Sequence, residues 1–489
     1  MQRSDADPGA SFAALDAKRI TRNSLYLVAG QALARAIGFV YILTLARFLG
    51  VQDFGLYNLV LGLVAIAMTG VDFGLARLVV RDLARDEQRI ASYLATLLPL
   101  RAMLAVAGYA ALLASVWLAG YSGRTLLLTA IAAVTLLPTT LGFMFDTLFH
   151  ARQQMHKSAA GDVVLALAQV ATGVGVLIAG GSLELVLVTN IVAGFAYFVF
   201  LTRQAFVSGY RFRPRFDRAL GIELMRRSGP YALVTLLAAL AARAELLLLG
   251  ALSSGEDLGL FSAAAKFPET CLLLPAVLAA SAAPVISQFH AAAPERLREV
   301  YGWMMRRVLT VTLPLALAGV VLAPAILGLL FPPAFQRATP VLQILFAGFP
   351  LAALQLVNSA MFMMSDRPRV MMATAGASAA LQFALGTVLI ARWGMIGGAV
   401  SAAVSHALSF AVSYGCLRRW FIDTTGLALQ IGPPLAGGAI ASAVAWIALG
   451  RWGMVAVVPV LAAFVIGHAA FSKLWPTRLG APEVGETRP

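Results

Sequence analysis

Long apolar stretches separated by short polar turns follow one another from end to end of the chain. A helix crosses the ~30 Å hydrocarbon core of a bilayer with about 20 apolar residues. Fourteen stretches approach this length, and they lie at residues 23–46, 54–72, 95–119, 125–149, 159–180, 183–202, 229–250, 262–285, 308–330, 339–363, 370–391, 396–417, 430–449 and 453–472. The pattern predicts an all-α integral membrane protein with about fourteen transmembrane helices. It leaves almost no chain for a soluble catalytic domain.

Composition and charge placement agree with this prediction. Hydrophobic residues make up 60% of the chain and charged residues only 12%, against about 25% charged in a soluble domain. The net charge of +14 is spread over loops: of 37 Lys and Arg, one set of alternate loops holds 28 and the other holds 5. Positive residues mark the cytoplasmic side of a membrane protein. We therefore expect both termini in the cytoplasm, and no nucleic acid as partner.

The largest connection between apolar stretches is basic and separates six predicted spans from eight. The expected organisation is a cytoplasmic tail at 1–22, an N-terminal lobe at 23–202, a cytoplasmic basic connection at 203–228, a C-terminal lobe at 229–417, two further helices at 430–472 and a cytoplasmic tail at 473–489.

A short sequence recurs at equivalent turns of the two lobes. Leu49-Gly50 precedes DFGLY at 53–57, and Leu249-Gly250 precedes DLGLF at 257–261. An even number of predicted spans separates the copies, so both have the same orientation in the membrane. This indicates parallel repeats, that is, two pseudo-symmetric six-helix lobes, as in several transporter folds.

Four cations lie inside predicted spans, namely Arg35, Arg101, Arg243 and Lys266. A charged side chain at mid-bilayer costs about 3 kcal/mol on insertion scales, so it normally faces a partner or a wet cavity. We expect these four to bind an anionic substrate in a cationic cavity. Arg35 is the strongest case because its own span contains no acid, and Gln31 lies on the same helical face.

Structural pairing of these charges is the alternative interpretation. Lys266 and Glu269 are three residues apart on one face and can neutralise each other. Arg243 and Glu245 point in different directions on a helix, so each needs another partner. Three acids near cytoplasmic helix ends, Asp72, Asp146 and Asp162, are expected to meet arginines of the loops.

Other polar residues could support the cavity. The predicted supporting residues are Gln31, Glu245, Glu269, Gln355, Asn358 and Gln382. Four serines recur every four residues, at 401, 405, 409 and 413. Small residues at this spacing let helices approach closely, which predicts a packing seam.

Several loose motifs occur in a fixed order along the chain. They are LARFLG at 45–50, DFGLY at 53–57, DFGL at 72–75 with Arg81, GLFSAAAK at 259–266, PVIS at 284–287 and GGA at 397–399. In these motifs the chain resembles the Wzx-type oligosaccharide flippases, the polysaccharide transporters of the MOP exporter superfamily.

The resemblance implies two six-helix lobes around a central cavity that opens to one side at a time, followed by two C-terminal helices. It implies a polyprenyl-pyrophosphate-linked oligosaccharide as cargo, moved to the outer leaflet of the bacterial inner membrane for O-antigen, capsule or exopolysaccharide synthesis. Lys266 matches a cation that serves the cargo site in such families. Partners implied are the lipid-linked substrate, membrane lipid and a polysaccharide polymerase or ligase complex. We expect no cofactor and no metal site; coupling to H⁺ or Na⁺ stays open.

Three alternatives remain. A lipid II flippase of the same superfamily would share the cavity chemistry and differ in cargo. A MATE-like drug or cation exporter would use carboxylates in its first lobe, where the first span has Arg35 and no acid. A membrane enzyme would need a large outer loop, but the outer connections are short, so we expect no catalytic residues.

Overall fold

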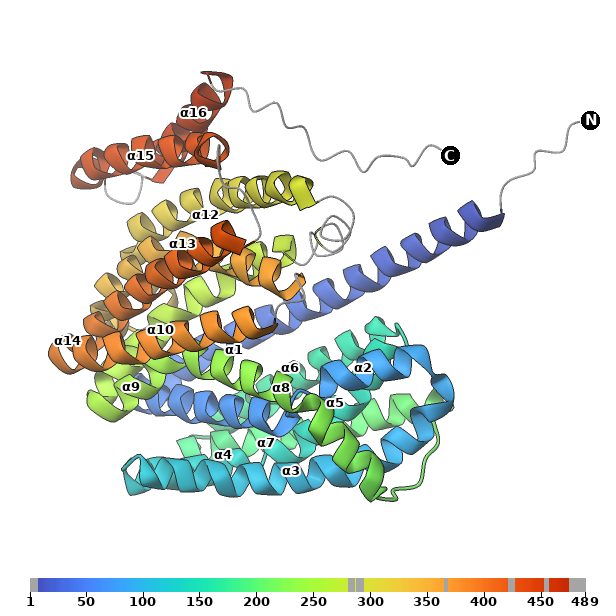
Figure 1. The fold of residues 1–489 in the computed structure, drawn as a ribbon. Coiled ribbons are helices and arrows are strands. Elements are labelled where there is room, and N and C mark those ends of the chain that lie inside the picture. The colour runs from blue at the N-terminus through green and yellow to red at the C-terminus, as the bar shows by residue number, and fades with distance from the viewer. Residues whose placement is uncertain are drawn as a thin grey trace, which may run out of the picture. The chain divides into compact units, whose positions relative to one another are not determined.

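The computed structural model describes residues 8–279, 286, 294–364, 368–420, 427–452 and 457–474, and these residues form helices and short connections without a strand. The helices are α1 (Pro8–Asp72), α2 (Leu75–Arg85), α3 (Ile90–Leu118), α4 (Gly123–Ala133), α5 (Leu136–Ala151), α6 (Met155–Ile178), α7 (Leu183–Val207), α8 (Arg218–Ala242), α9 (Ala244–Leu252), α10 (Gly255–Cys271), α12 (Pro294–Leu330), α13 (Thr339–Met364), α14 (Pro368–Trp420), α15 (Leu427–Trp452) and α16 (Val457–Leu474) (Figure 1). Two 3-10 helices lie at Glu87–Arg89 and Pro333–Ala338.

The predicted membrane spans coincide with helices wherever the structure describes them. Nine helices are long and apolar enough to cross a membrane within the described residues, or ten if the bent pair α8 and α9 forms one span. Two of the nine, α1 and α14, each contain two predicted spans, and two shorter apolar helices lie at Ile431–Val444 and Val457–Ala470. A bilayer favours helices because every backbone polar group is then satisfied within the segment. The prediction of an all-α, multi-pass membrane protein is confirmed.

Glycines break the two longest helices between their predicted spans. Gly50 has φ 71° within α1, and Gly394 has φ 51° within α14. Only glycine adopts such angles without a steric cost from Cβ. A single glycine therefore separates the consecutive spans at both positions.

Polar residues start helices where the chain leaves a turn. The Ser122 hydroxyl accepts a hydrogen bond from the Thr125 amide at 3.2 Å, which caps α4. The Ser254 hydroxyl accepts one from the Asp257 amide at 3.1 Å, which caps α10. Each cap satisfies one of the amides that the first turn of a helix leaves without a partner.

The chain folds into two compact units. The first consists of Met1–Leu49 and Tyr57–Ala239, and the second of Gly50–Leu56 and Leu240–Pro489. The division thus falls inside α8, and the short segment after the first predicted span belongs to the second unit.

The core of the first unit is aromatic and aliphatic. Tyr93, Phe145, Phe149, Tyr197 and Leu224 are buried together where α2, α3, α5, α7 and α8 meet. Burying such side chains provides the dispersion contacts that hold helices together in lipid, where water does not drive association.

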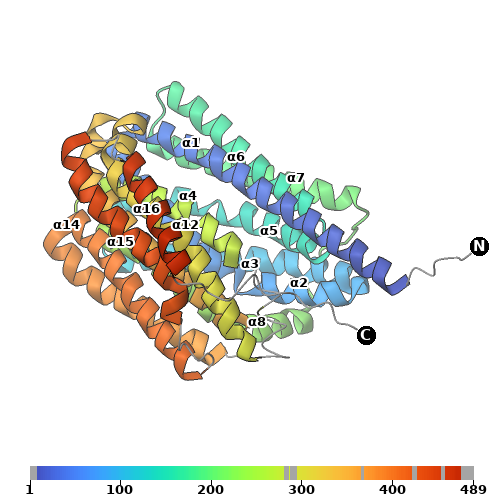
Figure 2. The same ribbon diagram turned by 90° about the horizontal axis from the view of Figure 1, so that it is seen from above.

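Small residues let α1 approach α6 closely in the same unit. A methyl group on Gly30 would lie 2.5 Å from Cβ of Ala159, and one on Gly173 would lie 2.0 Å from the Tyr41 hydroxyl oxygen. Figure 2 shows α1, α6 and α7 side by side. The two contacts progress in the same direction along both helices, so α1 and α6 pack in parallel.

The second unit packs α12, α13 and α14 around Tyr301, Met304, Met361, Phe362 and Leu417. A smaller cluster of Val321, Ala441, Val460 and Phe464 joins α15 and α16 to α12. The four serines at 401, 405, 409 and 413 are all buried on α14. The predicted packing seam is therefore confirmed.

Candidate substrate site

A bend in the second unit places a cation at a helix junction. The chain turns by 55° between α8 and α9. Arg243 sits at the junction with φ −123° and ψ 8°, outside the helical region. Its Nη1 lies 3.3 Å from Oε1 of Glu269 on α10. The bend therefore directs the guanidinium towards a second helix.

The same carboxylate serves a second cation. Nζ of Lys266 lies 3.5 Å from Oε2 of Glu269, one turn away on α10. Two cations thus share one carboxylate, which leaves a net positive charge of one. The side chain of Glu269 is 44% exposed and that of Arg243 34%. Ion pairs this exposed are worth about 0–1 kcal/mol each, so a more highly charged anion can displace the carboxylate.

Glu245, on the first turn of α9, has a different partner from Arg243. It is 7% exposed, and Gln382 on α14 donates a hydrogen bond from Nε2 to its Oε1 at 2.6 Å. The prediction that Arg243 and Glu245 would need separate partners is confirmed. The structure also confirms the proximity of Lys266 and Glu269.

Arg101, in the first unit, is held by an ion pair. Its side chain is 1% exposed, and Nη2 lies 2.9 Å from Oδ1 of Asp72. Nη1 donates to the carbonyl oxygen of Thr140 at 3.3 Å. The expectation that Asp72 meets a loop arginine is wrong. The chain breaks at Phe73 and Gly74, which have φ 49° and 71°, and α1 ends with Asp72 facing α3.

Arg35 differs from the other three predicted cations. Its side chain on α1 is exposed, and it makes no hydrogen bond or ion pair with any residue that the structure describes. Gln31 lies one turn earlier on the same face, and a methyl group on Gly38 would meet nothing within 4 Å. This face of α1 therefore offers an uncompensated guanidinium in open space.

Three of the predicted supporting residues are tied into the interior of the second unit. Asn358 is fully buried; it accepts a hydrogen bond from the Tyr301 hydroxyl at 2.8 Å and donates one to Ser413 at 2.7 Å. Ser413 in turn donates to Oε1 of Gln355 at 2.9 Å. This chain of bonds joins α12, α13 and α14. With the bond of Gln382 to Glu245 described above, Asn358, Gln355 and Gln382 all take part in hydrogen bonds between helices in this conformation.

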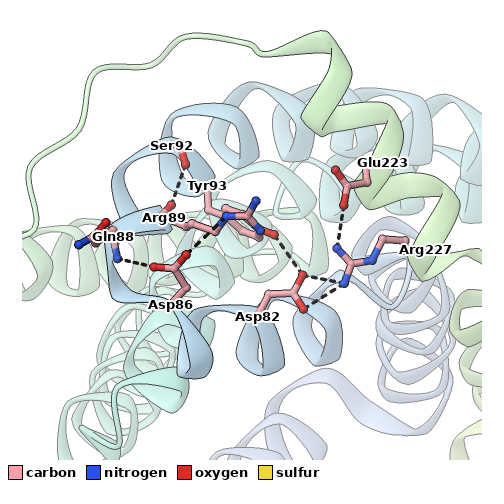
Figure 3. Close-up of polar contacts among 8 residues, drawn as sticks. All are labelled: Asp82, Asp86, Gln88, Arg89, Ser92, Tyr93, Glu223 and Arg227. Carbon is pink, nitrogen blue, oxygen red and sulfur yellow. Dashed lines mark hydrogen bonds and ion pairs between the residues drawn. The ribbon is translucent and has the colours of Figure 1, made fainter.

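The first unit also contains a polar network that the sequence pattern does not predict. The Asp82 carboxylate on α2 lies 2.9 Å from Nη2 of Arg227 on α8 and accepts a hydrogen bond from the Tyr93 hydroxyl at 3.0 Å. Nη1 of Arg227 lies 2.9 Å from Glu223 (Figure 3). Only the spacing of Glu223 and Arg227, four residues apart, could have been read from the sequence.

Residues 20–290, more than half of the chain, match the family of polysaccharide biosynthesis proteins. The chain belongs to this family, and the family resemblance of its sequence is confirmed. No curated protein matches it.

Solved structures show the same fold. The lipid II flippase MurJ in an inward closed conformation has a TM-score of 0.74 and 11% identity, covering 92% of this chain and 98% of that chain. A multidrug resistance MATE family transporter of the MOP superfamily, inward-facing, has a TM-score of 0.65 and 14% identity, covering 81% and 95%. A MOP superfamily transporter from Pyrococcus furiosus, described as having a binding pocket of reversed polarity, has a TM-score of 0.59 and 15% identity, covering 84% and 96%. These three proteins are named as transporters or flippases.

Proposed function

We propose that this protein is a flippase that moves a polyprenyl-pyrophosphate-linked oligosaccharide from the cytoplasmic to the outer leaflet by alternating access. The observation that carries the proposal is the group of Arg243, Lys266 and Glu269, in which one exposed carboxylate balances two cations inside membrane helices. The family, whose name refers to polysaccharide biosynthesis, supports a glycan cargo.

The chemistry of a pyrophosphate fits this group. Arginine grips phosphate oxygens with two parallel N–H donors, whereas lysine acts as a point charge. A pyrophosphate carries more negative charge than the single carboxylate of Glu269, so it competes for both cations. Arg35 supplies a further guanidinium that no described acid neutralises. In the first unit, Arg101 is available to an anion only if Asp72 releases it.

Topology supports the direction of transport. The excess of Lys and Arg in one set of loops supports cytoplasmic termini in the bacterial inner membrane. Cargo made in the cytoplasm would be released on the outer side, where a polysaccharide polymerase or ligase consumes it. Lipid II is the second candidate cargo, since the lipid II flippase MurJ has a similar fold.

The test compares lipid extracts of cells lacking the gene with those of complemented cells. We expect deletion to accumulate an intact lipid-linked oligosaccharide that an external glycosidase cannot reach, and its mass distinguishes lipid II from another repeat unit. Wild type should relieve the accumulation, whereas Arg35→Ala and Lys266→Ala should not. Arg392→Ala, at an exposed α14 position with no ion pair among the described residues, is the matched control.

Two results would count against this function. Normal complementation by both Arg35→Ala and Lys266→Ala, at normal protein levels, would contradict the cationic site. Altered drug or ion sensitivity without any lipid-linked oligosaccharide would instead favour a MATE-like exporter.

A further inference from the structure

A second polar cluster lies inside the first unit, between α5 and α6. Asp146 and His150 lie one turn apart on α5, and Ser158 and Asp162 lie one turn apart on α6. The Ser158 hydroxyl donates a hydrogen bond to Oδ1 of Asp146 and lies 3.2 Å from Nε2 of His150. The same Nε2 lies 3.7 Å from Oδ2 of Asp146. Two carboxylates, an imidazole and a hydroxyl thus meet between two helices.

Tyr197 on α7 points its hydroxyl into this cluster. The residue is fully buried, and its hydroxyl has no hydrogen-bond partner among the described residues. Asp146 and Asp162 both lie within electrostatic reach of it. Its ring is seated between helices at two glycines: a methyl group on Gly142 would lie 2.4 Å from Cδ1, and one on Gly161 3.2 Å from Cε2. A buried hydroxyl without a partner is costly, so its place beside two carboxylates calls for a functional explanation.

The surrounding charges leave the two carboxylates uncompensated. Apart from the contact with His150, neither Asp146 nor Asp162 forms an ion pair with a described residue. The arginines of the neighbouring helices have other partners. Arg101 of α3 is bound to Asp72 of α1. Arg227 of α8 is bound to Asp82 of α2, and Arg81 also lies 3.5 Å from Asp82.

The remaining cations nearby are also engaged or make no ion pair with the cluster. Lys157 of α6 donates to Gln154 and Ser208, and Arg152 is bound to Glu87. Arg35 of α1, which packs in parallel with α6, makes no ion pair with either carboxylate. Two adjacent carboxylates in a low-dielectric surrounding resist simultaneous ionisation, so the cluster favours the uptake of one positive charge.

We propose that Asp146, His150 and Asp162, assisted by the hydroxyls of Ser158 and Tyr197, form a proton-binding site that couples the transport cycle to a proton gradient. The imidazole favours a proton over Na⁺, because hard cations take oxygen ligands and His150 occupies one side of the site with nitrogen. Ser158 and His150 lie between the carboxylates and the helix ends at Ala151 and Met155, on the side with most Lys and Arg. A proton taken up from one side of the membrane forms an O–H bond with a carboxylate oxygen, and this bond breaks when the proton leaves on the other side, so that each cycle transfers one proton and leaves the site unchanged. The coupling role rests on the transport function proposed above, but the binding site does not.

Infrared difference spectroscopy of the purified full-length protein tests the site directly, because protonated carboxyl groups have a carbonyl band that carboxylates lack. Wild type should show such a band that disappears as the pH is raised, and Asp146→Asn/Asp162→Asn should lack it at every pH. Asp82→Asn, which removes a carboxylate held by Arg227, is the control and should keep it. A band that persists in the double variant, or is missing from wild type, would overturn the proposal. Exchanging choline for Na⁺ as the cation of the buffer should leave the band unchanged. A band that Na⁺ suppresses would identify a sodium site instead.

Single variants keep the test decisive if the double variant does not fold. The two single variants are Asp162→Asn and Tyr197→Phe. Asp162 makes no hydrogen bond to a described residue, and Tyr197→Phe removes only an unpartnered hydroxyl, so both variants should fold. Each should shift the midpoint of the band, and an unchanged midpoint in both would contradict the site. A titrating band without transport of lipid-linked oligosaccharide would keep the proton site and refute the proposed cargo. Transport that is unaffected when the pH gradient is collapsed would refute the coupling.

Discussion

Gly55 and Gly259 approach each other so closely that neither can carry a side chain. A methyl group on Gly55 would lie 2.7 Å from the amide nitrogen of Gly259, and one on Gly259 would lie 2.0 Å from the carbonyl oxygen of Val51. Both positions belong to the second unit, and they are the equivalent glycines of the two recurring sequences. The repeat therefore marks a backbone-to-backbone contact, which requires glycine in both copies.

Replacement of one of these glycines should destabilise the protein. Gly259→Ala forces the backbone at Val51 to move, and overpacking of this kind costs about 1–3 kcal/mol. We expect a lower Tm in detergent. Gly175→Ala on α6, where a methyl group meets nothing within 4 Å, is the matched control and should leave Tm unchanged or raise it. Equal Tm values for the two variants would show that the close contact does not matter for stability.

Loss of Asp72 alone should destabilise the protein more than loss of Asp72 and Arg101 together. Asp72→Asn leaves a guanidinium that is 1% exposed without its partner, and breaking a buried pair costs about 3–5 kcal/mol. Unfolding measurements on Asp72→Asn and on Asp72→Asn/Arg101→Met should show the double variant to be the more stable. Arg89→Gln, which removes an ion pair whose two side chains are 57% and 49% exposed, should cost at most about 1 kcal/mol. A double variant less stable than Asp72→Asn would mean that Arg101 stabilises the fold without the acid.

Asp82 should matter far more than Glu223, although both bind Arg227. The Asp82 side chain is 10% exposed and also accepts from Tyr93, so Asp82→Asn should cost about 1–3 kcal/mol. Glu223 is 53% exposed, and its pair with Arg227, four residues away, is worth about 0.2–0.5 kcal/mol. Urea unfolding of Asp82→Asn and Glu223→Gln compares the two. Similar losses of stability for the two variants would show that the ion pair of Arg227 with Glu223, within α8, contributes as much as its pair with Asp82.

Glu269 should act as a competitor of the anionic cargo. Glu269→Gln frees Arg243 and Lys266, and the loss of pairing worth up to about 1 kcal/mol corresponds to roughly fivefold tighter anion binding. Equilibrium binding of inorganic pyrophosphate to the purified protein should strengthen in Glu269→Gln, weaken in Lys266→Gln and stay unchanged in Arg392→Gln. Weaker binding in Glu269→Gln would mean that the carboxylate positions the cations instead of competing for them.

The sequence predicts the helices well because the bilayer leaves few alternatives. Each predicted span is long and apolar, and a helix satisfies its backbone within the segment. Local pairs such as Lys266 and Glu269 follow from the helical period in the same way. The turns at Gly50 and Gly394 were predicted as span boundaries, and the structure adds that each is a single residue with positive φ.

Long-range pairs could not be predicted in the same way. Gln382 binds Glu245 from 137 residues away, and Arg227 binds Asp82 from 145 residues away. The sequence shows that Glu245 needs a partner, but several polar residues on later spans were equally suitable. The partner of Asp72 depends on the break at Phe73 and Gly74, whose direction is set by tertiary packing.

Direct transport of the cargo is the most decisive measurement. Lipid-linked oligosaccharide extracted from cells that lack the gene is placed in vesicles with or without the purified protein, and an external glycosidase then cleaves what it can reach. We predict that wild-type protein makes almost all of the lipid accessible, whereas Lys266→Ala vesicles and protein-free vesicles expose only the outer-leaflet share. If wild-type and protein-free vesicles expose the same share, with a proton gradient of either direction applied, the protein is not a flippase for this lipid.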